Sequence, residues 1–318
     1  SNDNTAKLWS GDKEPVELKH DNILLSAVFS PDGRRILTAS MDGTAKLWDV
    51  NGNLKAKLSH SGAVSYADFS PDGKFILTVS FDGAARLWNQ TGKPLGKINS
   101  DEIVTSAMFS PDSSQIITTS DRAYPKVWSL EGKRLLELEN DKSATFAGFS
   151  PDGQEIATIS KDGAARVWNL DKKLLAVLKH DDAISSIVFS GDSRLILTAS
   201  EDGFAKLWNL AGKPLAEFKH EGAVTSALFS PDNQSILTAS KDGTARLWNL
   251  QGELLANLNK HQGAVNSAVF SPDGSRILTA SDDKTAKVCL TPAAIYKWLQ
   301  TAKVAQLSKE EKKRLGIE

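Results

Sequence analysis

The stretch from Glu221 to Asn249 reads EGAVTSALFSPDNQSILTASKDGTARLWN, and this pattern decides the fold. It begins with Ala223–Phe229, a run of small, β-branched and apolar residues that predicts a buried strand. Ser235–Ser240 predicts a second strand and Thr244–Trp248 a third, because both are short, rich in β-branched or apolar residues, and bounded by turn signals. Leu254–Leu258, just beyond the quoted stretch, supplies a fourth. The unit is therefore predicted to be a sheet of four short strands.

Turn residues connect these strands. Pro231-Asp232 follows the first strand, where proline fixes φ and aspartate accepts hydrogen bonds from the backbone ahead of it. Asp242-Gly243 separates the second and third strands, and this dipeptide favours a tight hairpin. Strands joined by such short turns pair in the antiparallel sense.

The unit recurs along the chain every 40 residues, with one step of 41 near Lys260. The sequence Phe-Ser-Pro-Asp, or its variant Phe-Ser-Gly-Asp, starts at Phe29, Phe69, Phe109, Phe149, Phe189, Phe229 and Phe270. Tryptophan repeats in step, at Trp9, Trp48, Trp88, Trp128, Trp168, Trp208 and Trp248, with Cys289 in the last slot. A lone four-stranded sheet leaves both faces in water, whereas stacked sheets closed into a ring bury them. We expect sheets at 23–58, 63–98, 103–138, 143–178, 183–218, 223–258 and 264–289, within a repeat region of residues 1–290.

The unit resembles the WD40 repeat, whose signature has a histidine before the first strand and Trp-Asp at the end of the third. Trp48-Asp49 keeps this dipeptide, and most copies read Trp-Asn, as in Trp248-Asn249. The resemblance is to the highly repetitive bacterial type and covers residues 1 to about 290. It implies an all-β fold, a seven-bladed β-propeller with four antiparallel strands in each blade.

All five histidines occupy one position of the repeat. They are His20, His60, His180, His220 and His261, and Ser100 and Asn140 fill the two remaining slots. In the family this histidine joins a hydroxyl, an aspartate and the tryptophan in a buried hydrogen-bond network. The resemblance implies such networks for His20, Asp42 and Trp48, for His60, Asp82 and Trp88, for His180, Asp202 and Trp208, and for His220, Asp242 and Trp248. In the first blade Thr38 and Ser40 are both candidates for the hydroxyl, because residues two apart share a strand face. These polar groups would each be costly to bury alone, and the network satisfies them together.

The same pattern argues against catalysis. Histidines and aspartates that repeat with the fold are interpreted as structural, and no histidine lies outside that register. With one cysteine, Cys289, and no spare histidine, a zinc site is disfavoured. No nucleophile-elbow, phosphate-loop or metalloprotease motif occurs. We therefore expect no catalytic residue, no metal and no cofactor.

Composition narrows the class of partner. The 318 residues include 38 lysines and arginines and 39 aspartates and glutamates, a formal net charge of -1. Nucleic-acid binding favours a basic face, so we expect no nucleic-acid partner. No run of about 18 apolar residues occurs, so no membrane span is predicted. The single cysteine fits a reducing compartment, and we expect a cytoplasmic location.

Both ends of the array depart from the repeat. The last copy supplies three strands, and residues 15–19 read as an outer fourth strand, so we expect them to complete blade seven. Residues 1–9 align with Ser40–Trp48 as a third strand without the two that should precede it. From this we expect a C-terminal propeller cut from a longer bacterial signalling or regulatory protein.

Residues 291–318 predict a helical tail. Thr291-Pro292 is a typical helix start, and Ile295, Trp298 and Leu299 follow at helical spacing. Ser308 with Glu311 predicts a second, short helix. The tail either caps the last blade, the interpretation we favour, or docks a partner through Trp298.

Blade three breaks the pattern. The run Ser120–Pro125 replaces the usual Ser-x-Asp-Gly-Thr-Ala, and Pro125 predicts a bent or edge strand because it lacks an N–H. Drift within a redundant array explains this change, and so does adaptation to a ligand at Arg122 and Tyr124.

In the family, partners often bind the narrow top face. Its exposed positions lie three and five residues after the histidine slot and just before the turn aspartate. Large apolar side chains fill these positions only in blades one to three, at Ile23, Leu25, Met41, Phe81 and Ile103. We call these five residues the apolar rim. Such a cluster is a candidate interface for a protein or peptide. The resemblance also implies a ring of blades around a central channel, and the alternative is that these side chains pack into one another around the mouth of that channel.

These observations favour a non-catalytic protein–protein interaction scaffold. The alternative is a propeller-type hydrolase or a small-ligand-binding protein. A hydrolase would need inward-facing histidine or acidic clusters, and the histidines are already assigned to the repeated network.

Overall fold

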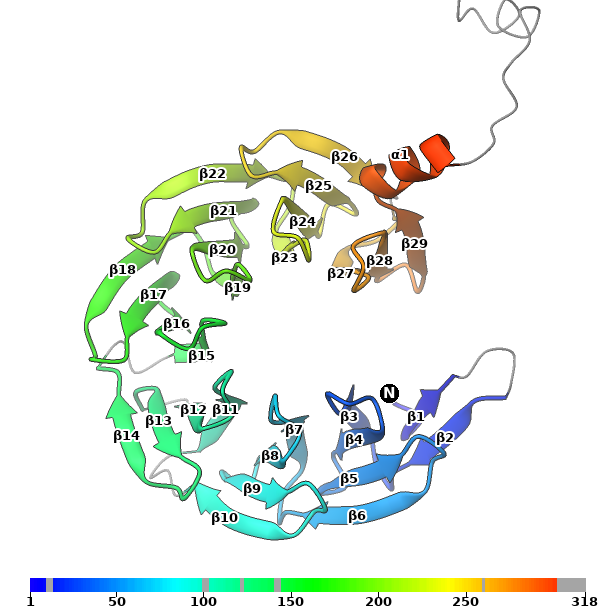
Figure 1. Ribbon diagram of the computed structural model, residues 1–318, viewed down its shortest axis with the longest axis vertical. Helices are drawn as coiled ribbons and strands as arrows, with labels where there is room; N and C mark the ends of the chain where they lie inside the picture. Colours follow the sequence, from blue (N-terminus) through cyan, green and yellow to red (C-terminus); the bar gives the residue numbers. More distant parts are fainter. Residues whose placement is uncertain (10–13, 99–102, 121–122, 140–143, 259–260, 302–318) are drawn as a thin grey trace, which may run out of the picture. The chain divides into compact units, whose positions relative to one another are not determined.

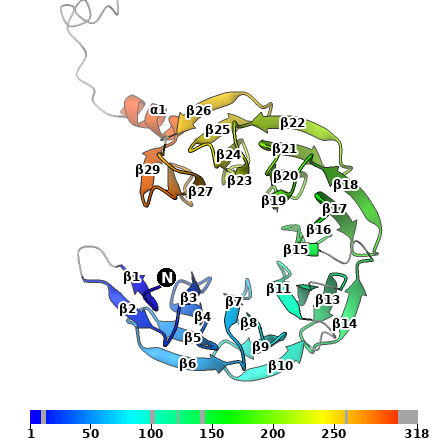
Figure 2. The ribbon, with the colours of Figure 1, turned by 180° about the vertical axis from the view of Figure 1, so that it is seen from behind.

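In the computed structural model the described residues are 1–9, 14–98, 103–120, 123–139, 144–258 and 261–301, the last four by their backbone alone. They form β-strands and one short helix (Figure 1; Figure 2 gives the view from behind), so the predicted all-β class is confirmed. The chain divides into two compact units, Ser1–Thr198 with Trp208–Pro214, and Ala199–Leu207 with Leu215–Glu318.

The four-stranded sheets, or blades, are antiparallel, and in each of them the strands lie in chain order. The first four blades are β3 Leu24–Phe29, β4 Arg35–Ser40, β5 Thr44–Asp49 and β6 Leu54–Ser59; β7 Val64–Phe69, β8 Phe75–Ser80, β9 Ala85–Asn89 and β10 Pro94–Ile98; β11 Val104–Phe109, β12 Gln115–Ser120, β13 Lys126–Ser129 and β14 Arg134–Glu137; β15 Ala144–Phe149, β16 Glu155–Ser160, β17 Ala164–Asn169 and β18 Leu174–Lys179. Within the first unit they follow one another side by side in chain order (Figure 1).

The later sheets repeat this arrangement. They are β19 Ile184–Phe189, β20 Leu195–Ser200, β21 Phe204–Asn209 and β22 Pro214–Lys219; β23 Val224–Phe229, β24 Ser235–Ser240, β25 Ala245–Asn249 and β26 Leu254–Leu258; and the three-stranded β27 Val265–Phe270, β28 Arg276–Ser281 and β29 Ala286–Leu290.

The Ser-Pro-Asp turn shows why the first hairpin forms where the sequence predicts it. The Ser230 hydroxyl donates to Asp232 Oδ1 at 2.5 Å and accepts the Ser235 N–H at 2.9 Å. Asp232 Oδ1 also accepts the Gln234 N–H at 3.1 Å. The side chains thus satisfy backbone groups that the turn leaves out of the ladder, which is how these residue types favour turns.

A register shift near the start of the first strand sets which side chains face which neighbour, and it occurs in β3, β7, β11, β15, β23 and β27. In β7 the shift falls between Val64 and Tyr66. Beyond it, Ala67 and Phe69 are buried in the core shared with blade one, so Tyr66 and Asp68 lie on the opposite face, towards blade three.

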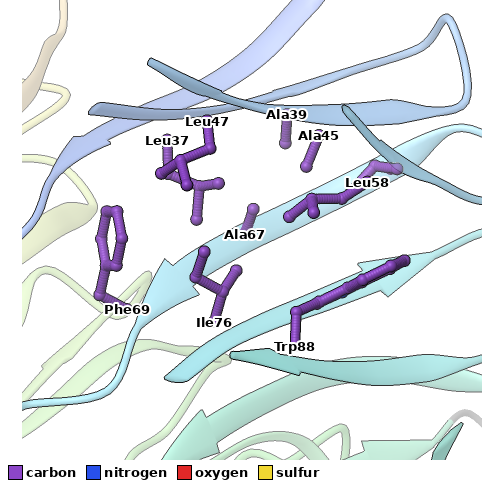
Figure 3. Packing of buried hydrophobic residues seen from close by; sticks show 10 residues of the cluster. Leu37, Ala39, Ala45, Leu47, Leu58, Ala67, Phe69, Ile76 and Trp88 are labelled. Carbon is purple, nitrogen blue, oxygen red and sulfur yellow. The ribbon is translucent and has the colours of Figure 1, made fainter. Parts of the chain in front are cut away.

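The cores lie between neighbouring blades. Between blades one and two, Leu37 and Leu47 come from one sheet and Ile76 and Trp88 from the next (Figure 3). The same arrangement joins Leu237 and Leu247 to Ile277 in the second unit, where Cys289 packs in the tryptophan slot. Each blade therefore depends on its neighbour for burial, as expected for a repeat array.

The first strands of the chain pair differently from the prediction. Val16–Lys19 (β2) was expected to complete the last sheet, but it pairs with Thr5–Leu8 (β1). The register places Ala6 opposite Leu18, as Ala45 lies opposite Leu58 in blade one. β1 is thus a third strand in type, and it offers β2 the same edge that β5 offers β6.

The helical tail begins as predicted. Helix α1 spans Pro292–Thr301, and Thr291 caps it, because its Oγ1 accepts the Ala294 N–H at 3.3 Å. The side chain of Trp298 and the predicted second helix at Ser308 lie outside the described residues. In blade three β13 starts directly after Pro125, as the missing N–H requires.

Candidate functional site

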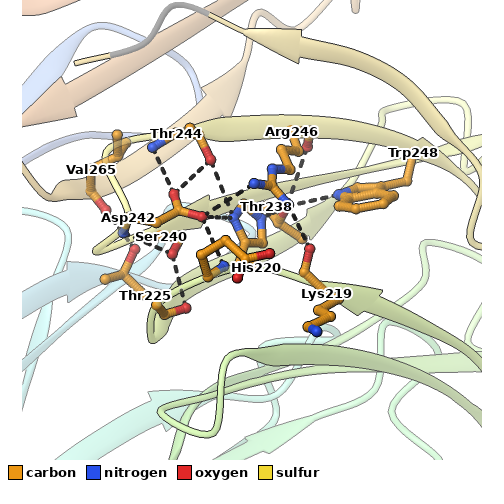
Figure 4. A network of polar contacts seen from close by, with 12 residues as sticks. Lys219, His220, Thr225, Thr238, Ser240, Asp242, Thr244, Arg246, Trp248 and Val265 are labelled. Carbon is orange, nitrogen blue, oxygen red and sulfur yellow. Dashed lines mark hydrogen bonds and ion pairs between the residues drawn. The ribbon is translucent and has the colours of Figure 1, made fainter.

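A hydroxyl group lies at the centre of each complete polar network. In blade six, Thr238 Oγ1 accepts the Trp248 indole N–H at 2.8 Å and lies 2.7 Å from His220 Nε2 (Figure 4). His220 Nδ1 lies 2.9 Å from Asp242 Oδ2, and Asp242 Oδ1 accepts the hydroxyl and the N–H of Thr244. The short contacts are consistent with donation from the indole to the hydroxyl, from the hydroxyl to imidazole Nε2, and from imidazole Nδ1–H to the carboxylate, and the hydroxyl also has a longer contact of 3.3 Å with the Arg246 carbonyl. The imidazole in this arrangement is neutral.

The same geometry in blade one decides between the two hydroxyl candidates. Thr38 Oγ1 accepts the Trp48 N–H at 2.9 Å and lies 2.7 Å from His20 Nε2. Ser40 lies beside the network instead: its hydroxyl accepts the Asp42 N–H at 3.1 Å and contacts the Ile23 carbonyl at 3.0 Å. The serine thus holds the backbone that carries Asp42, and the assignment of Ser40 to the network itself is corrected to Thr38.

The contacts of this network recur in other blades. The histidine–threonine contact also occurs at His60–Thr78, His180–Thr198 and His261–Thr279, and the histidine–aspartate contact at His60–Asp82 and His261–Asp283. Trp88, Trp128, Trp168 and Trp208 all donate to the corresponding threonine. Ser100 and Asn140, which replace histidine in blades three and four, lie outside the described residues.

Burial leaves these imidazoles no access to a substrate. The ring-bearing side chains of His20, His60, His220 and His261 are 0% exposed. Burial lowers the pKa of His20, His60 and His220 below the ordinary value, although the adjacent aspartates oppose this shift. Burial also opposes ionisation of Asp42 and Asp242, but the hydrogen bonds from Thr44, Thr244 and their neighbours outweigh it and bring both pKa values to about 2.

These shifts predict a loss of stability in two steps on acidification. Below a pH of about 6.5 the unfolded histidines bind protons that the folded ones resist, so the free energy of unfolding falls. A second loss follows from about pH 4 towards pH 2, as Asp242 and its equivalents become protonated in the unfolded chain first. We expect the thermal midpoint to fall between pH 7 and pH 5, and to fall less in His220→Asn, which carries the residue found at Asn140. An identical pH dependence in the two proteins would contradict the neutral-imidazole assignment.

The apolar rim is a separate feature of the first unit. Leu25 is 42% exposed, Met41 40%, Phe81 66% and Ile103 59%, and Ile23 is half-buried. Hydrogen bonds fix the backbone beneath them: the Met41 N–H donates to the Ile23 carbonyl, and the Phe81 N–H to the Ala63 carbonyl, both at 2.9 Å. The four exposed side chains therefore present apolar surface on a rigid frame, and packing into one another does not bury them.

Neither a metal site nor a membrane-spanning helix is found in the described part of the chain. It holds no cluster of three or more histidine, cysteine, aspartate or glutamate side chains that could bind a metal ion. No helix within it is long and apolar enough to cross a bilayer.

Four-stranded antiparallel sheets repeated along one chain, each joined internally by the same tryptophan–threonine hydrogen bond, define a protein of the β-propeller class. The family profile described as WD40, "WD domain, G-beta repeat", matches residues 14–49, 52–89, 132–169, 172–209, 212–249 and 252–289. The chain belongs to the WD40 family. The unmatched segment 90–131 contains the departure at Pro125.

The crystal structure of a computationally designed protein, Ika8, is similar in fold. It aligns with a TM-score of 0.78 over 92% of each chain, at 23% sequence identity. No curated protein sequence matches the chain.

Proposed function

We propose that this chain is a non-catalytic protein–protein interaction scaffold of a bacterial signalling or regulatory protein, acting in the cytoplasm. WD40 propellers are in general scaffolds that bind protein partners, and this chain belongs to that family. The observation that carries the proposal is that the histidines and the rim residues lie in different environments. The histidines are buried and hydrogen-bonded at their ring nitrogens, whereas four rim residues expose large apolar groups.

The apolar rim is the surface proposed for the partner. Phe81 and Met41 project from the ends of neighbouring second strands and are the natural anchors, because large apolar side chains dominate the energy of an interface. At the same positions of blade four, in the same unit, the exposed Thr145 and Lys161 supply the polar surroundings that such an interface has.

A double substitution tests this proposal. Partners captured by the wild-type chain should bind Met41→Ser/Phe81→Ser about 100-fold more weakly, since each buried anchor contributes roughly 1–2 kcal/mol or more. The matched control is Leu95→Ser/Leu135→Ser, which removes two similarly exposed apolar side chains from the outer strands β10 and β14. Full affinity of the rim variant, or equal losses in both variants, would rule the rim out as the binding surface.

A further inference from the structure

At one position of the first strand, a single blade has a residue of a different chemical type from the other blades. The next-to-last residue of that strand is Val28, Met108, Gly148, Val188, Leu228 or Val269 in six copies and Asp68 in blade two. Two residues earlier five copies have serine, whereas blades two and four have Tyr66 and Phe146. Comparison with the other copies of the repeat therefore shows that Asp68 is a carboxylate at a position that is otherwise apolar or glycine.

Asp68 lies in a groove. The hollow measures about 400 Å³ and is lined by Tyr66, Asp68, Met108, Phe109, Phe149 and Pro151, among others. Aromatic rings and prolines make most of the wall, and Asp68 is its one charged residue. Among the described residues none forms an ion pair with Asp68, so its charge is not neutralised by a neighbouring lysine or arginine.

The hydrogen bonds of Asp68 leave it able to accept more. The Tyr66 hydroxyl donates to Oδ2 at 2.8 Å, and the Phe69 N–H donates to Oδ1 at 2.7 Å. Each carboxylate oxygen accepts two hydrogen bonds, so both retain a free acceptor site. Burial, and then the charge of Asp68, raise the pKa of Tyr66, so the phenol remains a donor at neutral pH.

Such a site fits a cation carried on an apolar stem. Aromatic faces attract cations, and a carboxylate in partly apolar surroundings forms a strong, charge-assisted hydrogen bond with a donor. A compact ammonium group needs only one of the two acceptor sites that remain, whereas the planar fork of a guanidinium group needs one on each oxygen in a single plane, so Asp68 sets a less demanding geometry for an ammonium group.

The groove continues beyond one side chain. A second hollow of about 250 Å³ shares Met108, Phe149 and Pro151 with the first, and Phe146 and Phe189 contribute to its walls. No charged residue lines this second hollow among the described residues. An occupant that fills both is therefore a chain segment in which a cationic side chain lies next to an apolar one.

We propose that this groove binds a lysine side chain of a protein partner, with the ammonium group at Asp68, the methylene stem against Met108 and Phe109, and a neighbouring apolar residue in the second hollow. The site is distinct from the apolar rim. The rim residue Ile103 precedes β11, whereas Met108 and Phe109 end it, roughly 3.3 Å per residue further along the strand. The inference therefore does not depend on the function proposed for the rim.

Two capped peptides test this assignment by titration calorimetry on the full chain. Acetyl-Leu-Lys-Leu-amide is expected to bind at least tenfold more tightly than acetyl-Leu-norleucine-Leu-amide, which keeps the stem and lacks the charge. Asp68→Asn, which keeps the shape, and Asp68→Val, which copies Val28 and Val188, should each reduce the affinity for the lysine peptide to that of the norleucine peptide. The control Asp171→Asn removes an exposed charge from a turn and should change neither affinity.

Three results would overturn the proposal. They are equal affinities of the wild-type chain for the two peptides, no measurable binding of either, and unchanged lysine-peptide affinity in Asp68→Asn. The first comparison uses the wild-type chain alone, so it holds even if a variant folds poorly. Met41→Ser/Phe81→Ser should bind the lysine peptide normally, which separates this groove from the apolar rim.

Discussion

Replacing Thr238 by valine is expected to lower the free energy of unfolding by about 3 kcal/mol, because it leaves two buried polar groups without partners. Valine matches the shape of threonine, so no cavity forms. The Trp248 indole N–H loses its acceptor at 2.8 Å, and His220 Nε2 loses the hydroxyl at 2.7 Å. The loss should appear as a lower urea midpoint with an unchanged slope.

Blade three provides the matched control for this prediction. There Thr118 accepts the Trp128 N–H at 2.8 Å, and no histidine occurs in the corresponding slot. Thr118→Val should therefore cost about 1–2 kcal/mol, the effect of one orphaned donor. Equal losses at Thr238 and Thr118 would show that the imidazole adds nothing to the hydroxyl. Thr238→Ser, which retains the hydroxyl, should cost less than Thr238→Val.

Which hydroxyl enters the network could not be predicted from the sequence. Thr38 and Ser40 lie on one face of β4, and strand periodicity treats them alike. The choice depends on where the His20 ring lies after the chain turns back, a tertiary distance that no local pattern contains. The strands and turns could be predicted because each follows from local chemistry that recurs every 40 residues.

The strand that pairs with β2 could not be predicted from the sequence, for a different reason. Thr5-Ala6-Lys7-Leu8 and Thr285-Ala286-Lys287-Val288 are almost the same segment, so each offers β2 an equivalent edge. The repeat pattern favours the pairing of β2 with the last sheet, whereas in the structure β2 pairs with β1. Repetition makes strand positions easy to predict and strand partners ambiguous.

The groove at Asp68 was missed although the sequence contains its signal. When the seven first strands are aligned, the other copies have apolar residues or glycine at the position of Asp68, and serine in five copies and Phe146 in one at the position of Tyr66. This departure lies outside both the histidine register and the positions of the top face. In a repeat protein, a residue that differs in type from the residues at the same position of the other repeats shows where one blade differs in chemistry.

Gly92→Ala is expected to lower the free energy of unfolding by about 3 kcal/mol, because strained backbone and steric overlap add together. Gly92 has a φ of 84° in the turn between β9 and β10, where this turn packs against the outer strand of blade one. A methyl group there would overlap Cβ of Ala56 and lie 3.0 Å from Cδ2 of Leu58.

Other turns of the same chain separate the two contributions. At Gly33, with a φ of 67°, nothing lies within 4 Å of an added Cβ, and the copies at Ser113 and Asn233 carry side chains in the same conformation. Gly33→Ala should therefore cost about 1 kcal/mol, the effect of the backbone alone. Comparable thermal midpoints for Gly33→Ala and Gly92→Ala would contradict the assigned overlap. A real difference would measure how tightly one blade's turn packs against its neighbour, since contacts between neighbouring blades stabilise a repeat array pair by pair.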